Sequence, residues 1–191
     1  MSTLIVVDVE ATCWPDNHNH RMEIIEIGAV ALSGEELATV REFQSFVRPI
    51  QNPTLSSFCS GLTTITQEEV DSADKFPDVL GRFIKWIGTD DCIIGAWGNY
   101  DHNQFMNDCK LHGISIPDCF DNYVNLKSLY SIVTNSRPCG MGKALNKCGL
   151  QLYGTHHRGI DDARNIAGIV RFALKDKMTK RLKSETFTRG Q

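Results

Sequence analysis

The sequence has 191 residues, a formal net charge of −3 and 41% hydrophobic residues, which fits one globular domain and excludes a protein that coats nucleic acid through a general basic excess. No apolar run approaches the roughly 20 residues of a membrane span, and acidic residues interrupt the first apolar run too early for a signal segment, so we expect no membrane association. The seven cysteines are odd in number and lack a Cys-x-x-Cys pair, which argues against a disulfide framework and a zinc site and favours a reducing cytoplasm.

The first predicted element is a short apolar run, residues 4–7, that leads directly into Asp8 and Glu10. Because the run is rich in β-branched residues and too short for a helix, it predicts a buried central strand. Side chains two residues apart on a strand point the same way, so these two carboxylates project together. They repel each other unless they share a cation, which points to a hard divalent metal held by oxygen ligands. The alternative at this point is a pair of ordinary loop carboxylates beyond a strand end.

Two further strands are predicted before the first helices. Residues 22–32 and 38–47 are rich in Ile, Val, Ala and Phe, and a turn at residues 33–36 separates them. Together with the first strand they predict an antiparallel meander, with the strand that carries Asp8 on its inner side.

The middle of the chain predicts helices. Residues 53–59 fit a short helix, and Thr66 with Glu69 three positions later matches a capping box. Residues 76–87 place apolar side chains at helical spacing and predict an amphipathic helix.

A fourth predicted strand, residues 91–96, leads through a short turn to Asp101 and a helix that ends near residue 112. Ligand sites of α/β proteins collect at the carboxyl ends of such strands, which makes Asp101 a candidate site residue. The alternative is that Asp101 is an ordinary first-turn aspartate, which the helix dipole favours, and both roles are compatible.

The last third of the chain predicts a short extended segment near residue 123, helices over residues 126–133 and 140–148, and a final helix from about residue 160. Asp161 and Asp162 lie in the first turn of that final helix, and since neighbouring helical residues diverge by about 100°, only one of them can face a site. His157 precedes them in a glycine-bearing loop. We expect a single domain over residues 1–178 and a basic tail over 179–191, either solvated or in contact with a phosphate backbone.

Four carboxylates and one histidine therefore stand out: Asp8 and Glu10 at the end of the first strand, Asp101 at the start of a helix, Asp162 in the first turn of the final helix, and His157 in the loop before it. Phosphodiester hydrolysis with two metal ions requires such a set, because the ions stabilise the attacking and leaving oxygens and several carboxylates must balance their charge. A histidine that titrates near neutrality can take the proton of the attacking water.

Three segments that carry these residues resemble the exonuclease motifs of the DEDDh family of 3′-to-5′ exonucleases. They are Asp-Val-Glu-Ala-Thr-Cys at 8–13, Gly-Asn-Tyr-Asp at 98–101, and the segment 157–167, which begins His-Arg-Gly-Ile-Asp-Asp. Together with the segment 58–67, the amino-acid sequence of these segments is similar to that of the Eri-type exoribonucleases. The resemblance spans residues from about 3 to about 175 and implies a ribonuclease H-like α/β fold: a mixed five-stranded sheet, with a meander of three antiparallel strands plus parallel strands, flanked by helices on both faces.

The resemblance also implies roles for the five polar residues. Asp8, Glu10, Asp101 and Asp162 would bind two Mg²⁺ ions, with Mn²⁺ as a substitute and Asp8 bridging both. His157 would be the general base.

The resemblance further implies where the nucleotide binds. The chain beside Ala11 and Thr12 would meet the sugar and base of the terminal nucleotide, and Tyr100 and Leu62 would line its pocket. Trp97 is a weaker candidate, for which a core role is at least as well supported.

The predicted function is that of a metal-dependent 3′-to-5′ exonuclease that releases 5′-mononucleotides from single-stranded RNA, with DNA as a further substrate. The partner is then a single-stranded nucleic acid, with RNA favoured, and the sequence does not identify a protein partner. One alternative is a DNA-directed proofreading or repair exonuclease. Another is a catalytically silent nucleic-acid or protein binding module, against which the presence of all five polar residues argues.

Overall fold

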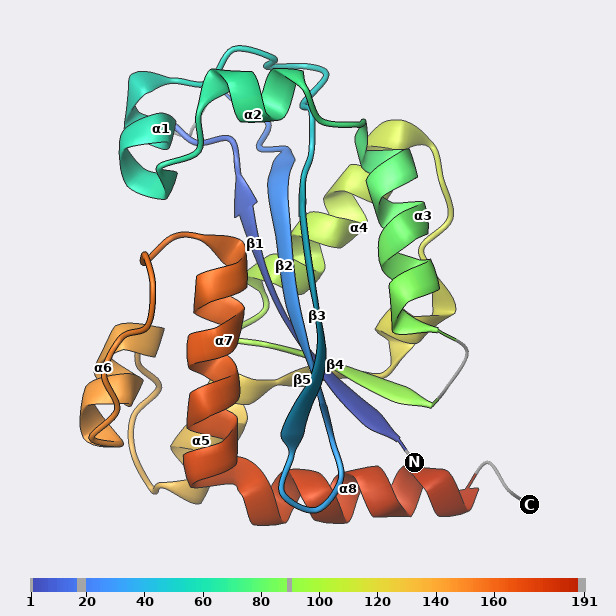
Figure 1. Cartoon of the computed structure of the whole chain (residues 1–191), viewed down its shortest axis with the longest axis vertical. Helices are drawn as coiled ribbons and strands as arrows, with labels where there is room; N and C mark the ends of the chain where they lie inside the picture. Colours follow the sequence, from blue (N-terminus) through green and yellow to red (C-terminus); the bar gives the residue numbers. More distant parts are fainter. Residues whose placement is uncertain (1, 17–19, 89–90, 189–191) are drawn as a thin grey trace.

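A mixed five-stranded sheet runs through the molecule, and helices cover both of its faces (Figure 1). The computed structural model describes residues 2–16, 20–88 and 91–188, with side chains through Ser184. The strand order is β3-β2-β1-β4-β5, in which β1, β2 and β3 are antiparallel while β4 and β5 run parallel to β1. The predicted fold class and the antiparallel meander are therefore confirmed.

The strands are β1 (Thr3–Ala11), β2 (Ile24–Ser33), β3 (Ala38–Phe46), β4 (Cys92–Ala96) and β5 (Tyr123–Asn125). The helices before β5 are α1 (Ser57–Thr63), α2 (Gln67–Asp71), α3 (Phe76–Ile87), α4 (Tyr100–His112) and a 3₁₀ turn at Asp118–Asp121. After β5 come α5 (Leu126–Val133), α6 (Met141–Lys147), α7 (Gly159–Ile169), a π-helical turn at Val170–Leu174 and α8 (Lys175–Thr188).

β1 is apolar along its first half because both of its faces are buried. Ile5 and Val7 pack into a core shared with α3 and α4, whereas Leu4 and Val6 pack into a second core shared with α5, α6, α7 and α8. All four side chains are at most 1% exposed. A strand buried on both faces loses the polar alternation of a surface strand, so the apolar run correctly predicted a central position.

A third, smaller cluster holds α1 and α2 over the end of the sheet to which β1 points (Figure 1). Its buried members are Ile25, Leu55, Cys59, Ile65 and Val70. The cluster places the α1 segment beside the carboxyl end of β1.

The first helix of the middle segment lies later in the sequence than predicted. The expected helix over residues 53–59 is instead α1, Ser57–Thr63, because the hydroxyl of Ser56 accepts a hydrogen bond from the backbone N–H of Cys59 and caps a helix that starts after it. The capping box of Thr66 and Glu69 at the start of α2 is present as predicted.

The C-terminal part of the described chain is helical where a tail was expected. Residues 179–188 continue α8, because Met178 and Leu182 are buried in the same core as α7 and extend its apolar stripe beyond Leu174. A boundary at 178/179 would therefore cut a packed helix. In the described part of the chain, no helix combines the length and the apolar character needed to cross a membrane.

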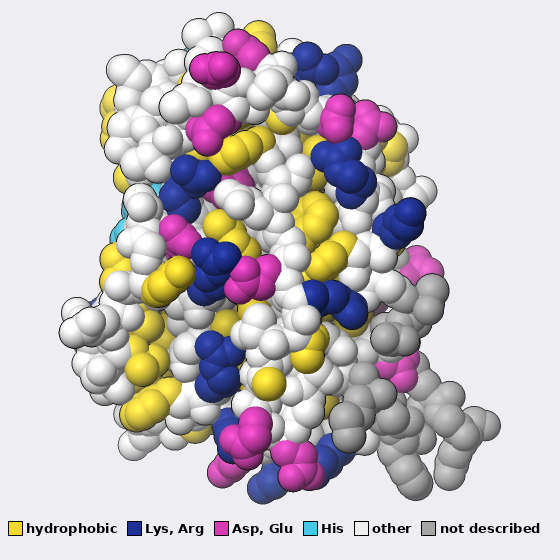
Figure 2. Space-filling model, viewed as in Figure 1, with side chains coloured by type: hydrophobic (Ala, Val, Ile, Leu, Met, Phe, Trp, Pro, Cys, Tyr) yellow, Lys and Arg dark blue, Asp and Glu magenta, His cyan; other side chains and the backbone are white. Residues whose placement is uncertain are grey.

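Charged side chains join α7 and α8 to the β2–β3 edge of the sheet. Arg164 contacts Glu42 on β3 with an Nη2–Oε2 distance of 2.6 Å, and Lys183 contacts Glu35 in the β2–β3 turn at 2.7 Å. Figure 2 shows the resulting mixture of basic and acidic groups over this face. Such exposed pairs contribute little to stability, so the position of α7 must depend on closer packing.

That closer packing is a contact between two glycines. A Cβ atom on Gly28 of β2 would lie 2.1 Å from the backbone of Gly159, and a Cβ atom on Gly159 would lie 3.0 Å from the carbonyl oxygen of Asp8. The N-terminus of α7 therefore rests directly on the sheet, and no side chain larger than hydrogen fits between them.

We predict that Gly28→Ala lowers the free energy of unfolding by about 1–3 kcal/mol or more, because the added methyl group meets rigid backbone. Urea unfolding followed by circular dichroism measures the change. Gly81→Ala on α3 is the matched control: apart from its own helix, no atom lies within 4 Å of the added Cβ, so its stability should stay equal or rise by about 0.5–1 kcal/mol. Equal stabilities for Gly28→Ala and the wild type would contradict the close contact.

Candidate active site

Three carboxylates from two elements meet at the end of β1. Asp8 and Glu10 project from the same face of the strand, and Asp162 reaches them from the first turn of α7. Each offers an oxygen that lies within 4.8 Å of an oxygen of the other two. Glu10 and Asp162 are buried, while Asp8 remains partly exposed. The group is thus open to solvent on one side.

Asp161 and Asp162 point to different surroundings, as their helical spacing predicts. Asp161 accepts hydrogen bonds from Arg164 Nη1 at 3.0 Å and from the backbone N–H of Thr155 at 2.9 Å, so it lies outside the group. Asp162 faces inward and accepts a hydrogen bond from the backbone N–H of His157 at 3.0 Å.

Asp101 joins the group from the other side of β1. It lies in the first turn of α4, directly after β4, and is 5% exposed. Its Oδ1 accepts a hydrogen bond from the backbone N–H of Val9 at 3.0 Å. Because Val9 lies between Asp8 and Glu10 on β1, this bond holds the Asp101 carboxylate beside that part of the strand. The structure therefore brings all four predicted carboxylates together.

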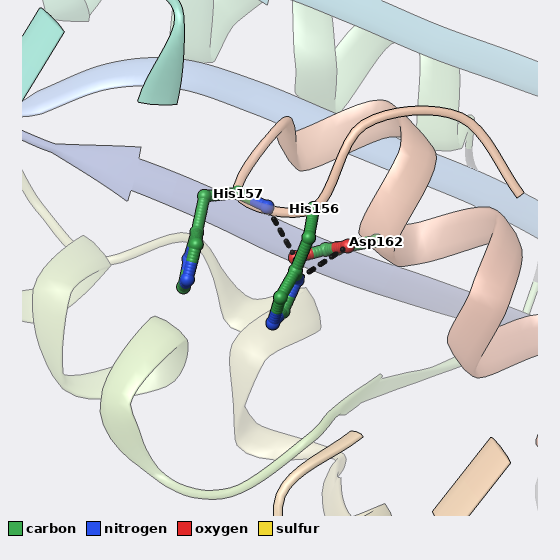
Figure 3. Close-up of side chains that lie close together, drawn as sticks. All are labelled: His156, His157 and Asp162. Atoms are coloured by element: carbon green, nitrogen blue, oxygen red, sulfur yellow. Dashed lines mark hydrogen bonds and ion pairs between the residues drawn. The ribbon is translucent and has the colours of Figure 1, made fainter. Parts of the chain in front are cut away.

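Two neighbouring histidines lie against Asp162 (Figure 3). Their rings stack with centroids 4.0 Å apart and an angle of 17° between planes, and His156 Nδ1 lies 2.9 Å from Asp162 Oδ2. His157 has a φ angle of 64°, a left-handed conformation that turns the loop toward the carboxylates. Burial, followed by the nearby charge of His156, lowers the pKa of His157 below 6.5, so its imidazole is neutral at pH 7.

Burial removes water from around Asp8, Glu10 and Asp101, so the charged forms of these carboxylates are less stable than in water. Burial, reinforced by the charges of Asp162 and Glu26, raises the pKa of Glu10 to about 8. Burial raises the pKa of Asp101 to about 6, and lost hydration together with the charge of Asp101 raises that of Asp8 well above its usual value. A cluster of oxygen donors with raised pKa values fits a hard divalent cation, which removes the repulsion.

Glu26 is a residue of the site that the sequence analysis missed. It is fully buried beside Glu10 across the β1–β2 ladder, and its Oε2 accepts hydrogen bonds from the backbone N–H of Gly159 at 3.0 Å and from Arg158 Nε at 3.2 Å. It therefore anchors the start of α7 and the end of the histidine loop to β2. A single acidic residue within the apolar run of β2 was the available signal.

His156 is the second missed residue. The sequence shows two adjacent histidines, but spacing alone did not indicate that both rings would lie on the same side of the loop. The left-handed turn at His157 produces this arrangement, and such a backbone conformation has no clear sequence signal at a residue other than glycine.

The segment after Glu10 is enclosed. Ala11 is 5% and Thr12 is 1% exposed, and Thr12 Oγ1 accepts a hydrogen bond from the backbone N–H of Glu23 at 3.0 Å. The side chain of Thr12 thus fastens β1 to the start of β2, which leaves only the rim of this segment for a ligand.

Leu62 and Tyr100, the two side chains expected to line the nucleotide pocket, lie at the surface on α1 and at the start of α4. Leu62 on α1 is 38% exposed and Tyr100 at the start of α4 is 48% exposed, large values for apolar and aromatic side chains. Tyr100 directly precedes Asp101, and burial, with the charges of Asp101 and Glu10, raises the pKa of its hydroxyl. Trp97 instead has the core role, since its Nε1 donates a hydrogen bond to the carbonyl of Cys139 at 2.9 Å and its ring packs into the core of α5 to α8.

The sequence matches a family model described as exonuclease over residues 5–170. It is 35% identical over 196 residues to ERI1 exoribonuclease 2 of Danio rerio, covering 92% of this chain and 35% of the relative. It is 36% identical over 185 residues to 3′-5′ exoribonuclease 1 of Rattus norvegicus, covering 91% of this chain and 53% of the relative. The chain therefore spans between about a third and about half of the length of these relatives.

The fold is similar to that of a solved nuclease domain, 3′hExo, described as a DEDDh family member bound to rAMP. The two structures superpose with a TM-score of 0.87 and 33% sequence identity, over 91% of this chain and 92% of that domain. The similarity thus includes nearly the whole of both domains.

The raised pKa of Glu10 makes a testable prediction about stability without metal. In the folded protein Glu10 keeps its proton up to about pH 8, whereas in the unfolded chain the carboxyl releases the proton above its usual pKa. The stability that this difference contributes is therefore present at low pH and is lost as the pH rises through about 8. We expect the Tm of Glu10→Gln, measured in EDTA, to rise relative to wild type as pH increases from about 5 to 8, since the amide cannot ionise.

The control is Glu68→Gln, a change of an exposed carboxylate on α2. Its Tm difference from wild type should be the same at both pH values. A difference for Glu10→Gln that is also independent of pH would show that the Glu10 carboxyl titrates normally.

Proposed function

Because the chain belongs to the exonuclease family, in its DEDDh group and Eri-type branch, we propose that it is a metal-dependent 3′-to-5′ exonuclease. It hydrolyses the phosphodiester bond at the 3′ end of single-stranded RNA and releases 5′-mononucleotides. The observation that supports this most directly is the convergence of Asp8 and Glu10 from β1, Asp101 from α4 and Asp162 from α7, with the neutral His157 beside them. The preference for RNA rests on the relatives named exoribonucleases and on the rAMP bound to 3′hExo.

Asp8, Glu10, Asp101 and Asp162 are the proposed metal ligands. Mg²⁺ is the expected ion, with Mn²⁺ as a substitute, because every donor is a carboxylate oxygen. Two bound ions would stabilise negative charge on the attacking and leaving oxygens. The fold contributes by holding the carboxylates together: β1 fixes two of them, and α4 and α7 each add one.

His157 is the proposed general base. Its ring is neutral at pH 7 and accepts the proton of the attacking water, while its backbone is held in place by the hydrogen bond to Asp162. Since Glu26 fixes the next two residues of the loop, the imidazole keeps its position relative to the carboxylates.

Leu62 and Tyr100 are proposed to flank the terminal nucleotide, beside the rim formed by Ala11 and Thr12. They approach the site from α1 and α4, and both are exposed. Stacking of a base on an aromatic ring such as that of Tyr100 contributes about 1–3 kcal/mol and accepts any base, which suits an enzyme that removes nucleotides in succession. Each cysteine of the described residues is a thiol and not half of a disulfide, which supports a cytoplasmic location.

Incubation with 5′-labelled single-stranded RNA tests the activity. We expect products shortened stepwise from the 3′ end in Mg²⁺ or Mn²⁺ and none in EDTA. Asp8→Asn should abolish the ladder while preserving the fold, because the amide removes a ligand and also relieves repulsion. Glu68→Gln, on the surface of α2, should keep wild-type activity.

DNA of the same sequence distinguishes the alternatives. Faster degradation of DNA than of RNA would favour a DNA-directed exonuclease. Full activity of Asp8→Asn, or activity in EDTA, would contradict the metal-dependent mechanism. No degradation of either polymer would favour a binding module.

His157→Ala should slow the single-turnover rate by about 10²–10⁴-fold, because water then loses its proton acceptor. The Mg²⁺ concentration for half-maximal rate should change little, since the carboxylates remain. His112→Ala, at the opposite end of α4 from Asp101, should keep the wild-type rate. If the Mg²⁺ requirement rises steeply in His157→Ala, His157 is a metal ligand instead.

A further inference from the structure

Asp162 belongs to two groups of potential metal ligands. One is the carboxylate group with Asp8 and Glu10, and the other is formed with the two histidines of the preceding loop, His156 and His157. Figure 3 shows the two rings side by side and the Asp162 carboxylate next to the ring of His156. The proposed hydrolysis makes no use of His156, although its ring lies within the site.

The separations within the histidine group suit one small ion. His156 Nδ1 and Asp162 Oδ2 are 2.9 Å apart, and each of the three residues offers a ligand atom within 4.8 Å of those of the other two. A tetrahedral ion with bonds of about 2.0–2.1 Å places its ligands roughly 3.3 Å apart. The two rings belong to neighbouring residues and stack face to face, so rotations about their side-chain bonds would bring the three ligand atoms around one ion.

The ligand chemistry separates this group from the carboxylates. Imidazole nitrogens favour Zn²⁺ and related transition-metal ions, whereas an all-oxygen group favours Mg²⁺ or Mn²⁺. The side chain of His156 is 44% exposed, so an ion can reach it from solvent and a water molecule can complete four ligands.

We propose that His156, His157 and Asp162 form a site for Zn²⁺ or a chemically similar transition-metal ion, and that an ion bound there stops hydrolysis. The inhibitory part rests on the proposed function. Coordination occupies the lone pair with which His157 would accept the proton of water. It also draws the Asp162 carboxylate toward the histidine loop and away from Asp8 and Glu10.

Co²⁺ tests the site without any substrate. The whole chain, freed of metal with EDTA and desalted, should develop the visible absorption of a four-coordinate Co²⁺ ion on addition of about one equivalent. Calorimetry should show that Zn²⁺ displaces it. Because this measurement requires no catalysis, it remains informative even if the protein has no nuclease activity.

The critical variant is His156→Asn, whose amide nitrogen can keep the hydrogen bond to Asp162 while the imidazole ligand is lost. We expect the absorption to disappear and Zn²⁺ affinity to fall at least about tenfold. Glu10→Gln, which alters only the carboxylate group, should keep both. His156→Gln is a second variant without a ring, and circular dichroism verifies folding. An unchanged spectrum in both His156 variants, or its loss in Glu10→Gln alone, would overturn the proposal.

Inhibition is measured at saturating Mg²⁺ on single-stranded RNA, each variant relative to its own activity without Zn²⁺. The Zn²⁺ concentration for half inhibition should rise at least about tenfold in His156→Asn compared with wild type. Equal sensitivity of the two proteins would show that Zn²⁺ acts at the carboxylates and would refute the inhibitory role.

Discussion

Repulsion between neighbouring carboxylates is the main unfavourable interaction that this fold must overcome. Asp8, Glu10, Asp101 and Asp162 lie together at one end of β1, where burial and neighbouring negative charge raise the pKa values of Asp8, Glu10 and Asp101. The favourable energy of the fold must come from elsewhere, chiefly from the two apolar cores on either side of the sheet. The first half of β1 contributes to both cores, so the same strand both stabilises the fold and carries its least favourable charges.

The site is held together by contacts that leave little room for adjustment. The backbone of Gly159 rests on Gly28, and the buried carboxylate of Glu26 binds the N–H of Gly159 and the side chain of Arg158. Because α7 cannot slide along the sheet without breaking these contacts, Asp162 stays near β1 in the absence of a ligand. Such preorganisation reduces the rearrangement that a charged substrate would otherwise require.

Much of this arrangement could be predicted from the sequence, because it follows from local rules. The apolar run before Asp8 identified the central strand, the two-residue spacing aligned Glu10 with it, and the capping box at Thr66 marked α2. The unpredicted features depend on contacts between distant segments. Glu26 has its role only because α7 returns to β2, and Leu182 continues the helix only because a core lies beneath it. Local sequence carries no direct record of such contacts.

The hydrogen bond between Val9 and Asp101 gives the Asp101 carboxylate a structural role as well as a place in the candidate site. β1 pairs with β4 only as far as Val6, and beyond that point Asp101 Oδ1 takes the backbone N–H that a neighbouring strand would have received. One oxygen of this carboxylate is thus part of the hydrogen bonding of the sheet. Replacing Asp101 with alanine removes both contributions at once, whereas asparagine keeps an acceptor for the amide of Val9 and removes only the charge. Under the proposed function, asparagine is therefore the substitution with which an intact, non-cleaving complex with a nucleic acid can be sought.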